Sequence, residues 1–293
     1  MSKILVTGAT GHLGKAVTSF LLQKTEAENI RLLVRDAAKA EDFSSKGVEI
    51  ALGDYNDHGS LVQAFKDIDK LYLVSGTDIE NRSAQQENVI NAAKEAGVKH
   101  VIYTSVQHKN ESAESPMAFI VNSHLHTEKV LKASGLTYTM LQHNLYADII
   151  PMFAGEKLLE NKTIYLPAGD GKTAFATRED MAEAGAVVLL DKTGQFDNKT
   201  IQIGGSEAVS WGQIAAIISK ITGETITYVS PSAVDFTATL TQANVPAEYI
   251  GIFSGFGQGI SEGEFDVVTY ELENLLGRNP VTAEVYLRGV YGK

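Results

Sequence analysis

Cysteine is absent from all 293 positions of this chain. The absence excludes disulfide bonds, thiolate metal sites and a cysteine nucleophile, and it favours a reducing compartment, so we expect a cytoplasmic protein. Long apolar runs are missing too, since no segment reaches the ~18 consecutive apolar residues of a membrane span. The first residues, MSKILVTG, pass into an apolar stretch without a secretory pattern, and we expect no membrane association.

Clusters of basic residues are also missing. The chain has 25 Lys and Arg against 36 Asp and Glu, which gives a formal net charge of −11. Because DNA and RNA binding needs clustered Lys and Arg for phosphate contacts, a nucleic-acid partner is excluded. No internal repeat occurs, and a hydrophobic content of 44% suffices for one large domain, alone or with a smaller one.

The first half of the sequence alternates short apolar runs with amphipathic segments. The apolar runs predict strands at 3–7, 30–35, 48–52, 70–75, 100–105 and 137–141. The amphipathic segments predict helices at 12–24, after Asp36, and at 57–66, 84–96 and 123–135. The runs are apolar rather than alternating, as in parallel strands covered on both faces. Repeated β–α units of this length predict an α/β fold with a Rossmann-type, doubly wound parallel sheet.

The alternation weakens after residue 150. Helices are predicted at 177–190, 210–222, 232–244, 246–262 and 281–290, and strands at 163–166, 200–204 and 225–229. We therefore predict a Rossmann domain at 1–150 and a smaller C-terminal α/β lobe for the substrate at 151–293. Part of this lobe can return to the main sheet.

A glycine-rich segment, VTGATGHLG, lies between the first strand and the first helix. Gly8 lets the chain turn, Gly11 lets the backbone approach a pyrophosphate, and Gly14 lets the helix pack closely on the strand. The helix N-terminus offers free N–H groups and partial positive charge to phosphates. We expect dinucleotide contacts from Gly8, Thr10, Gly11, His12 and Leu13. The alternative, an ordinary glycine-rich turn, is disfavoured by the position between a strand and an amphipathic helix.

The end of the second strand indicates which dinucleotide binds. An acid there binds the ribose 2′-OH of NAD, whereas an arginine there accommodates the 2′-phosphate of NADP. Arg35 occupies the last strand position, and Asp36 is well placed to cap the next helix. We therefore expect Arg35, aided by Lys39, to bind the 2′-phosphate, and NADP(H) to be preferred over NAD(H).

The spacing G-x-x-G-x-x-G resembles the extended and atypical branches of the short-chain dehydrogenase superfamily. This resemblance implies that Asp54, after the third strand, contacts the adenine amino group; the alternative is a solvated turn aspartate. Ser75, Gly76 and Thr77 follow the fourth strand, where small residues let the chain pass close to the cofactor.

Longer stretches narrow the resemblance. NVINAAKEAGVKHVIYTS, HLHTEKVLKASGLTYTML and LPAGDGKTAFATRED resemble the NmrA-like family, most of all its type 2 NAD(P)H:quinone oxidoreductases, with the triphenylmethane reductases nearby. The similarity covers almost the whole chain. It implies an NADP(H) cofactor and hydride transfer to a small planar acceptor such as a quinone. The family also includes proteins that bind the dinucleotide and regulate partners without turnover.

The helix after the fifth strand lacks a tyrosine. Typical short-chain dehydrogenases carry Tyr-x-x-x-Lys there, and the tyrosine gives a proton to the developing alkoxide. Here Lys129 is present, but Leu125 stands four residues before it. The missing donor counts against reduction of ordinary ketones and against a sugar-nucleotide epimerase or dehydratase. A quinone needs little proton help, because hydride addition gives a delocalised, weakly basic anion.

His124 and Lys129 are the catalytic candidates on this helix. His124 either faces the acceptor or makes a structural hydrogen bond; Lys129 either contacts the ribose or is a solvated helix lysine. His126 is expected at the surface. It projects about 200° away from His124 around the helix, so the two do not bind one metal ion, and we expect no metal site.

The segment LQHNLY, after the sixth strand, departs from the family pattern L-R-N-G/A-x-Y. The resemblance implies that it passes near the nicotinamide, with cofactor contacts from Gln142, His143 and Asn144. Tyr146 either stacks on the planar acceptor or packs within the lobe. The glycine-rich stretch AGDGKTAFATRED is expected to close the lobe rather than bind phosphate, and Arg178 at its end can reach the cofactor pocket.

The sequence thus predicts an NADPH-dependent oxidoreductase that transfers hydride to a quinone or similar planar acceptor. The alternative is a non-catalytic, NADP(H)-binding, redox-sensing regulator of the NmrA type. The missing tyrosine fits both.

Overall fold

The computed structural model describes residues 2–292, which form two compact units. The first contains the described residues up to Val106, with Ile120–His143 and Arg178–Gln202; the second contains Gln107–Phe119, Asn144–Thr177 and the chain from Ile203 onward. Each unit is therefore built from several chain segments. The boundary predicted at residue 150 falls at the start of a helix of the second unit, and residues 178–202 return to the first.

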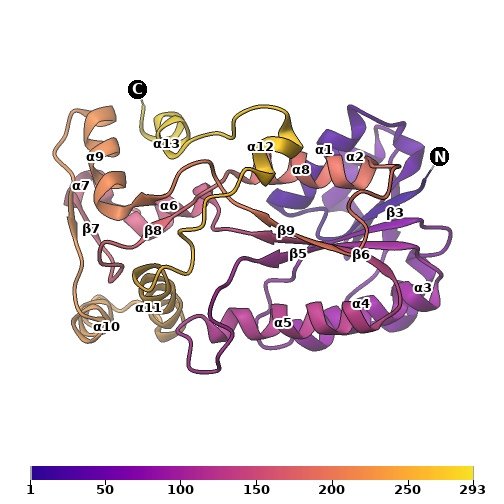
Figure 1. Ribbon diagram of the computed structural model, residues 1–293, viewed down its shortest axis with the longest axis horizontal. Helices are drawn as coiled ribbons and strands as arrows, with labels where there is room; N and C mark the ends of the chain where they lie inside the picture. The colour runs from indigo at the N-terminus through magenta and orange to yellow at the C-terminus, as the bar shows by residue number, and fades with distance from the viewer. Residues whose placement is uncertain (1, 293) are drawn as a thin grey trace. The chain divides into compact units, whose positions relative to one another are not determined.

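A seven-stranded sheet forms the centre of the first unit (Figure 1). Its strand order is β3-β2-β1-β4-β5-β6-β9. Its strands are β1 (Ile4–Val6), β2 (Ile30–Val34), β3 (Glu49–Leu52), β4 (Lys70–Leu73), β5 (His100–Val106), β6 (Thr137–His143) and β9 (Lys199–Ile203). Strands β1 to β6 pair in parallel, which confirms the predicted fold class. The strand order reverses at β1, and doubly wound sheets bind ligands beyond the carboxyl ends at such a point.

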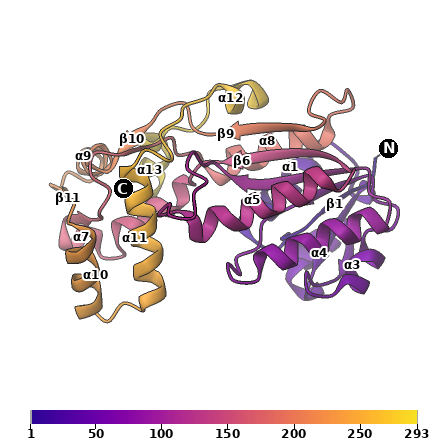
Figure 2. The same cartoon turned by 60° about the horizontal axis from the view of Figure 1, so that its bottom comes forward.

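Helices cover both faces of this sheet (Figures 1 and 2). One face carries α1 (His12–Leu22) and α8 (Arg178–Leu190), and the other carries α3 (His58–Ala64), α4 (Arg82–Glu95) and α5 (Ala118–Ala133). Shorter turns and helices are η1 (Ala27–Asn29), η2 (Ala37–Ala40) and α2 (Glu41–Ser44). Leu61, Val89 and Leu131 of the α3–α5 layer are fully buried in the core. On the other face, a Cβ on Gly185 of α8 would lie 2.5 Å from the Tyr72 hydroxyl oxygen, so glycine permits this close packing.

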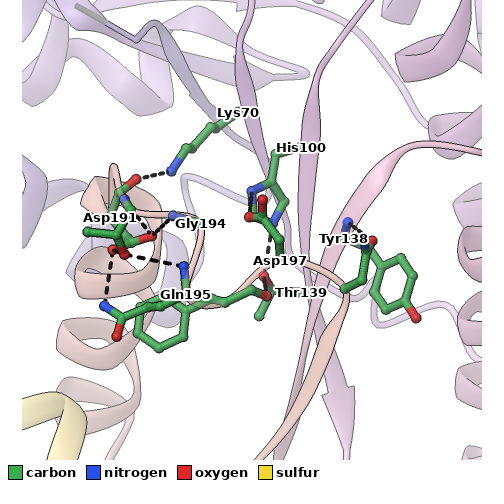
Figure 3. Close-up of polar contacts among 11 residues, drawn as sticks. Lys70, His100, Tyr138, Thr139, Asp191, Gly194, Gln195 and Asp197 are labelled. Atoms are coloured by element: carbon green, nitrogen blue, oxygen red, sulfur yellow. Dashed lines mark hydrogen bonds and ion pairs between the residues drawn. The ribbon is translucent and has the colours of Figure 1, made fainter.

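The connection from α8 to β9 is held against the amino ends of three strands (Figure 3). Lys70 Nζ donates a hydrogen bond to the Asp191 carbonyl oxygen at 2.5 Å. The Thr139 hydroxyl donates to the Phe196 carbonyl oxygen at 2.8 Å, and His100 Nε2 lies 2.8 Å from the same hydroxyl oxygen. Because the hydroxyl hydrogen is used, Nε2 is the donor in that bond. These bonds fasten the segment that leads into β9.

The second unit combines two small sheets with several helices. β8 (Lys172–Thr173) pairs antiparallel with β10 (Val209–Ser210), and β7 (Thr163–Tyr165) pairs in parallel with β11 (Thr227–Val229). Its helices are η3 (Ala147–Ile149), α6 (Ile150–Ala154), α7 (Leu158–Asn161), α9 (Trp211–Thr222), α10 (Ala233–Gln242), α11 (Ala247–Ser261), α12 (Glu271–Leu276) and α13 (Ala283–Tyr291). In its core, Phe153 stacks on Trp211 at 6.1 Å between ring centroids and meets Phe256 edge-on at 5.7 Å.

The structure lengthens one predicted helix and adds several short elements that were not predicted. α5 begins at Ala118 rather than Ser123, because the first turn continues the apolar face as far as the buried Val121. The sequence pattern predicts none of α6, α7, α12, β8 and β10, since each spans six residues or fewer and leaves too few positions for a periodicity. Among residues 2–292, no helix has the length and apolar content needed to cross a bilayer.

Candidate functional site

Glycines shape the connection from β1 to α1. Gly8 has a φ of +58°, in the left-handed region, and reverses the chain directly after β1. A Cβ on Gly14 would lie 2.4 Å from the Gly8 carbonyl oxygen, so the first turn of α1 packs on the loop only with glycine there. Gly11 precedes α1, and its amide donates to the Gly8 carbonyl at 2.9 Å. The three glycines close the loop tightly.

The N-terminus of α1 has the properties of an anion site. Gly11, its N-cap, supplies no capping side chain, and the first turn contains no acidic residue. Amides in a first helical turn lack intrahelical acceptors and carry partial positive charge. Thr10 and Gly11 line a cavity of about 390 Å³. His12 and Leu13 are the first residues of α1 and do not line the cavity. Their backbone amides belong to the first helical turn and can donate hydrogen bonds to a phosphate.

This cavity lies at the switch point of the sheet, within the first unit. Residues predicted to bind a cofactor line it, namely Gly8, Thr10, Gly11, Arg35, Asp54, Ser75, Gly76 and Thr77. They come from the loops after β1, β2, β3 and β4, so the structure brings four connections together. The lining also includes residues that the sequence pattern did not identify, namely Leu33, Val34, Gly53, Tyr55, Asn56, Val74, Asp78 and Gln85. All but Gln85 stand within a few positions of a predicted residue, and that proximity was the available signal.

Asp36 has the capping role that the sequence pattern predicts, whereas the phosphate contact of Arg35 stays a prediction. Asp36 Oδ1 accepts a hydrogen bond from the Ala38 amide at 3.0 Å and so caps η2. Arg35 is exposed and lines the cavity. Within residues 2–292 it is the only basic side chain of the lining, and Lys39 is not part of it. A ligand phosphate at this end of the cavity would therefore meet Arg35.

Asp54 combines a turn contact with a position in the cavity wall. Its Oδ1 accepts hydrogen bonds from the Asn56 backbone amide at 2.8 Å and from Asn56 Nδ2 at 2.9 Å. These bonds close the turn after β3 and use one carboxylate oxygen. Both roles considered for Asp54, turn residue and ligand contact, are compatible with this geometry.

Tyr55 joins the end of β3 to the ends of β1 and β4. Its hydroxyl oxygen lies 2.5 Å from Thr7 Oγ1 and 2.9 Å from the Val74 carbonyl oxygen. Thr7 Oγ1 in turn accepts from the Val74 amide at 3.0 Å. Burial raises the pKa of the Tyr55 hydroxyl, which therefore remains protonated. These hydrogen bonds thus hold the Tyr55 side chain in place in the cavity lining.

His124 is buried in the first unit, and both ring nitrogens have protein partners. Arg82 Nη1 lies 3.3 Å from Nε2, and the Tyr103 hydroxyl lies 2.7 Å from Nδ1. A guanidinium only donates, so Nε2 accepts and Nδ1 carries the proton. His124 is not part of the cavity lining. Its geometry is that of the structural hydrogen bond, which was one of the two alternatives.

The other candidates on α5 are not among the residues that line the cavity. Lys129 is exposed, in keeping with a solvated helix lysine. His126 Nε2 lies 2.8 Å from Glu87 Oε2, and its side chain is 41% exposed. Leu125, at the position of the missing tyrosine, is half-buried.

The end of β6 is buried. Gln142 Nε2 donates to Glu128 Oε1 at 3.0 Å, and the Ser105 hydroxyl donates to the same oxygen at 2.7 Å. Burial lowers the pKa of His143 to about 3, so its ring is neutral near pH 7. Neither Gln142 nor His143 lines the cavity. Glu128 was not identified as the partner of Gln142, because nothing local to α5 indicates a contact with β6.

Asn144 begins a segment of the second unit and is hydrogen-bonded within it. Its Nδ2 donates to Gln107 Oε1 at 2.5 Å and to the Phe265 carbonyl oxygen at 2.9 Å. Its Oδ1 accepts from the Leu145 amide at 2.7 Å. The side chain therefore connects segments of the second unit.

Tyr146 is half-buried in the second unit, and its backbone forms a β-bridge with Ala176. The glycine-rich stretch before Ala176 packs closely on α11, because a Cβ on Gly171 would lie 2.0 Å from the Ile260 carbonyl oxygen. This packing explains a glycine there without a phosphate. Arg178 begins α8 in the first unit and is not part of the cavity lining.

Comparison with known proteins finds relatives that match most of this chain. The profile of the NmrA-like family matches residues 1–284. Quinone oxidoreductase 2 of Escherichia coli is 34% identical over 279 residues, which are 95% of this chain and 95% of that protein. The NAD(P)H azoreductase of Xenophilus azovorans is 31% identical over 245 residues, which are 83% and 82% of the two chains.

Solved structures give the same grouping. The NADPH complex of the E. coli NADPH-dependent quinone oxidoreductase superposes with a TM-score of 0.92 at 33% identity, covering 99% of this chain and 100% of that one. Triphenylmethane reductase of Citrobacter sp. superposes at 0.89 and 32% identity, covering 99% of both. The negative transcriptional regulator NmrA, at 18% identity and a TM-score of 0.78, shares the fold.

Proposed function

This chain belongs to the NmrA-like family, and from that premise we propose that it is an NADPH-dependent oxidoreductase that transfers hydride to a quinone or similar planar acceptor. The observation that carries the proposal is the cavity between the glycine loop and Arg35, in a chain similar over almost its whole length to quinone, azo and triphenylmethane reductases. The cavity supports the cofactor, and the relatives support the class of acceptor.

The residues of the cavity fit a dinucleotide. The uncapped N-terminus of α1 and the glycine loop suit a pyrophosphate, and Arg35 suits a 2′-phosphate. Asp54 retains a carboxylate oxygen for an amino group, and Ser75 offers a hydroxyl beside β4. NADPH supplies the hydride when bound; the chain contributes binding, orientation and an environment for the transfer.

The absence of a tyrosine at position 125 supports an acceptor that needs little proton help. Leu125 has no ionisable group, so α5 offers no proton donor at the position that short-chain dehydrogenases use. Hydride addition to a quinone, or to a cationic triphenylmethane dye, does not create a strongly basic alkoxide. The task left to the protein is to hold donor and acceptor in a reactive orientation.

The alternative of a redox-sensing regulator has weaker support. Its structural relative is 18% identical, a likeness that carries the fold alone. The relatives above 30% identity are named as oxidoreductases. We therefore propose turnover as the activity of this chain.

Stopped-flow measurement of NADPH oxidation tests this function. NADPH absorbance is followed after mixing with a panel of benzoquinones and naphthoquinones, azo dyes and triphenylmethane dyes, under anaerobic conditions to suppress quinol reoxidation. We expect saturable turnover with at least one class and a higher kcat/KM for NADPH than for NADH. No oxidation above the enzyme-free rate with any acceptor would exclude the reductase, and faster NADH turnover would exclude the NADPH preference.

A further inference from the structure

A buried set of polar side chains links α4, β5 and α5 to the loop after β4, which lines the cavity. Its members are Arg82, Gln86, Tyr103, His124 and Thr127. Each is at most 7% exposed, and all belong to the first unit. Buried polar groups are costly unless they are hydrogen-bonded, so a set of this size inside a sheet–helix layer needs a physical reason.

The hydrogen bonds of this set run in a defined direction. Arg82 only donates, so His124 Nε2 accepts at 3.3 Å and Nδ1 bears the ring proton. Nδ1–H then donates to the Tyr103 hydroxyl oxygen at 2.7 Å. The Tyr103 hydroxyl donates to Gln86 Oε1 at 2.9 Å, and Gln86 Nε2 donates to Ser75 Oγ at 2.7 Å. A neutral His124 of one tautomer therefore fixes which way the Gln86 amide faces.

Both ends of this network reach the cavity wall. Arg82 Nε donates to the Gly76 carbonyl oxygen at 2.7 Å, while Gln86 donates to the hydroxyl of Ser75. Because Ser75 Oγ accepts from Gln86, its own hydrogen is left for two acceptors, the Tyr103 hydroxyl inside the network or an oxygen of a ligand in the cavity. Thr127 Oγ1 also contacts Gln86 Oε1 at 2.6 Å, and its single hydrogen is shared between this oxygen and the Ser123 carbonyl oxygen at 2.8 Å.

Arg82 itself is a buried cation. Its bonds in the described chain go to neutral acceptors, namely the Gly76 carbonyl, Ser123 Oγ and His124 Nε2, and it makes no salt bridge there. Burial lowers the pKa of Arg82. The charge of Asp78, which also lines the cavity, acts on Arg82 in the opposite direction, but its carboxylate makes no salt bridge with the guanidinium. A buried charge without a directly paired carboxylate costs free energy, and a neutral side chain could fill the same space. An anionic ligand in the cavity beside Gly76 offsets part of that cost.

We propose that Arg82, Gln86 and His124 are positioning residues of the dinucleotide site. They hold the Ser75–Gly76 loop in place and fix the Ser75 hydroxyl at the cavity wall. His124 acts through Tyr103 and Gln86 and does not exchange a proton with the acceptor. The effect on hydride transfer rests on the function proposed above, whereas the effect on dinucleotide binding rests on the cavity alone.

Binding measurements on network variants test the positioning role. NADPH fluorescence is titrated, without acceptor, on wild type, Gln86→Met and Tyr103→Phe. Gln86→Met removes both the donor to Ser75 and the acceptor for Tyr103; Tyr103→Phe removes one hydroxyl and keeps the ring. We expect the Kd for NADPH to rise about 10-fold in Gln86→Met and about 3-fold in Tyr103→Phe, as loss of one or two hydrogen bonds predicts.

Matched controls separate this effect from a general loss of stability. Lys94→Met changes an exposed residue on α4, and His126→Gln changes the half-exposed histidine on α5. Both should keep the wild-type Kd. If Gln86→Met does not give a cooperative melt, Tyr103→Phe decides, because its volume is nearly that of tyrosine. A wild-type Kd in folded Gln86→Met, or in folded Tyr103→Phe when Gln86→Met does not fold, overturns the proposal.

The pH dependence of turnover distinguishes positioning from proton transfer by His124. For His124→Gln we expect kcat to fall by a similar factor at every pH from about 6 to 9, with the shape of the profile retained. Loss of a titration that wild type shows would overturn the positioning role and make His124 a catalytic acid. If wild type binds NADPH but reduces no acceptor, the proposed function fails. The comparison of Kd values still tests whether the network positions the dinucleotide site.

Discussion

Gly14 lies so close to Gly8 that a Cβ on Gly14 would be 2.4 Å from the Gly8 carbonyl oxygen. Gly14→Ala must therefore displace the first turn of α1 from the phosphate loop. We expect a loss of about 1–3 kcal/mol in the free energy of unfolding and a drop of at least about 10-fold in NADPH affinity. Urea denaturation and calorimetric titration measure the two effects.

Gly289 provides the control for that variant. It lies in α13, is exposed, and nothing stands within 4 Å of an added Cβ. Gly289→Ala should leave NADPH affinity unchanged and stabilise the fold by up to about 1 kcal/mol, because alanine favours helix over glycine. Wild-type affinity in Gly14→Ala would contradict the assignment of this loop to the pyrophosphate.

Arg35 should determine the choice between NADPH and NADH. Arg35→Ala removes the only basic side chain of the cavity lining within residues 2–292. A charge-assisted hydrogen bond to phosphate contributes about 1.5–3 kcal/mol, so the Kd for NADPH should rise about 10- to 100-fold. The Kd for NADH should change less than about threefold. Lys24→Ala, an exposed change of equal charge outside the cavity, is the control; equal weakening of both dinucleotides by Arg35→Ala would refute the 2′-phosphate contact.

Lys129 should be dispensable. It is exposed on α5 and is not part of the cavity lining. Lys129→Ala should leave the Kd for NADPH and kcat within about twofold of wild type, the range of an ordinary surface substitution. The measurement is steady-state kinetics with the best acceptor of the panel. A rise of tenfold or more in the Kd would instead support the ribose contact known from other short-chain dehydrogenases.

His100 should make the fold sensitive to acid. Burial, and next the charge of Lys70, lower its pKa from the ordinary 6.5 to about 4. Between these values the unfolded chain binds a proton that the folded chain does not, so stability falls as pH drops from about 6.5 toward 4. Once His100 is fully protonated, the free energy of unfolding is lower by about 3 kcal/mol.

Denaturation of His100→Gln at several pH values measures this contribution. Glutamine keeps a donor for Thr139 but cannot take up the proton, so the variant should lose less stability than wild type between pH 6.5 and 4. The buried His143 remains and leaves a residual acid sensitivity. His126→Gln, at a half-exposed site, should follow the wild-type curve. An unchanged pH dependence in His100→Gln would show that the imidazole is protonated at little cost.

The parts of the site that could be predicted from the sequence are those set by local geometry. The glycine loop, Arg35 and Ser75 each begin within two residues of the end of a strand, and parallel strands bring their carboxyl ends to one edge of the sheet. Asp36 caps η2 through a bond to a residue two positions on, which the sequence also indicates. For such residues, position along one strand or turn determines position in space.

The residues that could not be predicted act over long sequence distances. Arg82 and Gln86 read as ordinary polar residues of a helix surface, yet both are buried by contact with β5 and α5. Their partners, His124 and Tyr103, stand in other β–α units. These side chains come together only through the way α4 packs beside α5 and β5. That packing cannot be predicted from a single sequence. The hydrogen bond between Gln142 and Glu128 could not be predicted for the same reason.

The late position of β9 in the sequence affects folding during translation and the choice of truncated variants. Lys199–Ile203 lies beyond β6 in the sheet, but it leaves the ribosome only after the segment Asn144–Thr177 of the second unit has been translated. Until then β6 is an open edge, with unpaired backbone that invites association with other chains. The face later covered by α8, including Tyr72, is exposed over the same interval. A gene fragment ending near residue 150 would thus encode a chain without α8 and β9, which is prone to aggregate. A minimal dinucleotide-binding protein requires residues 178–202 to be fused to the N-terminal part of the first unit.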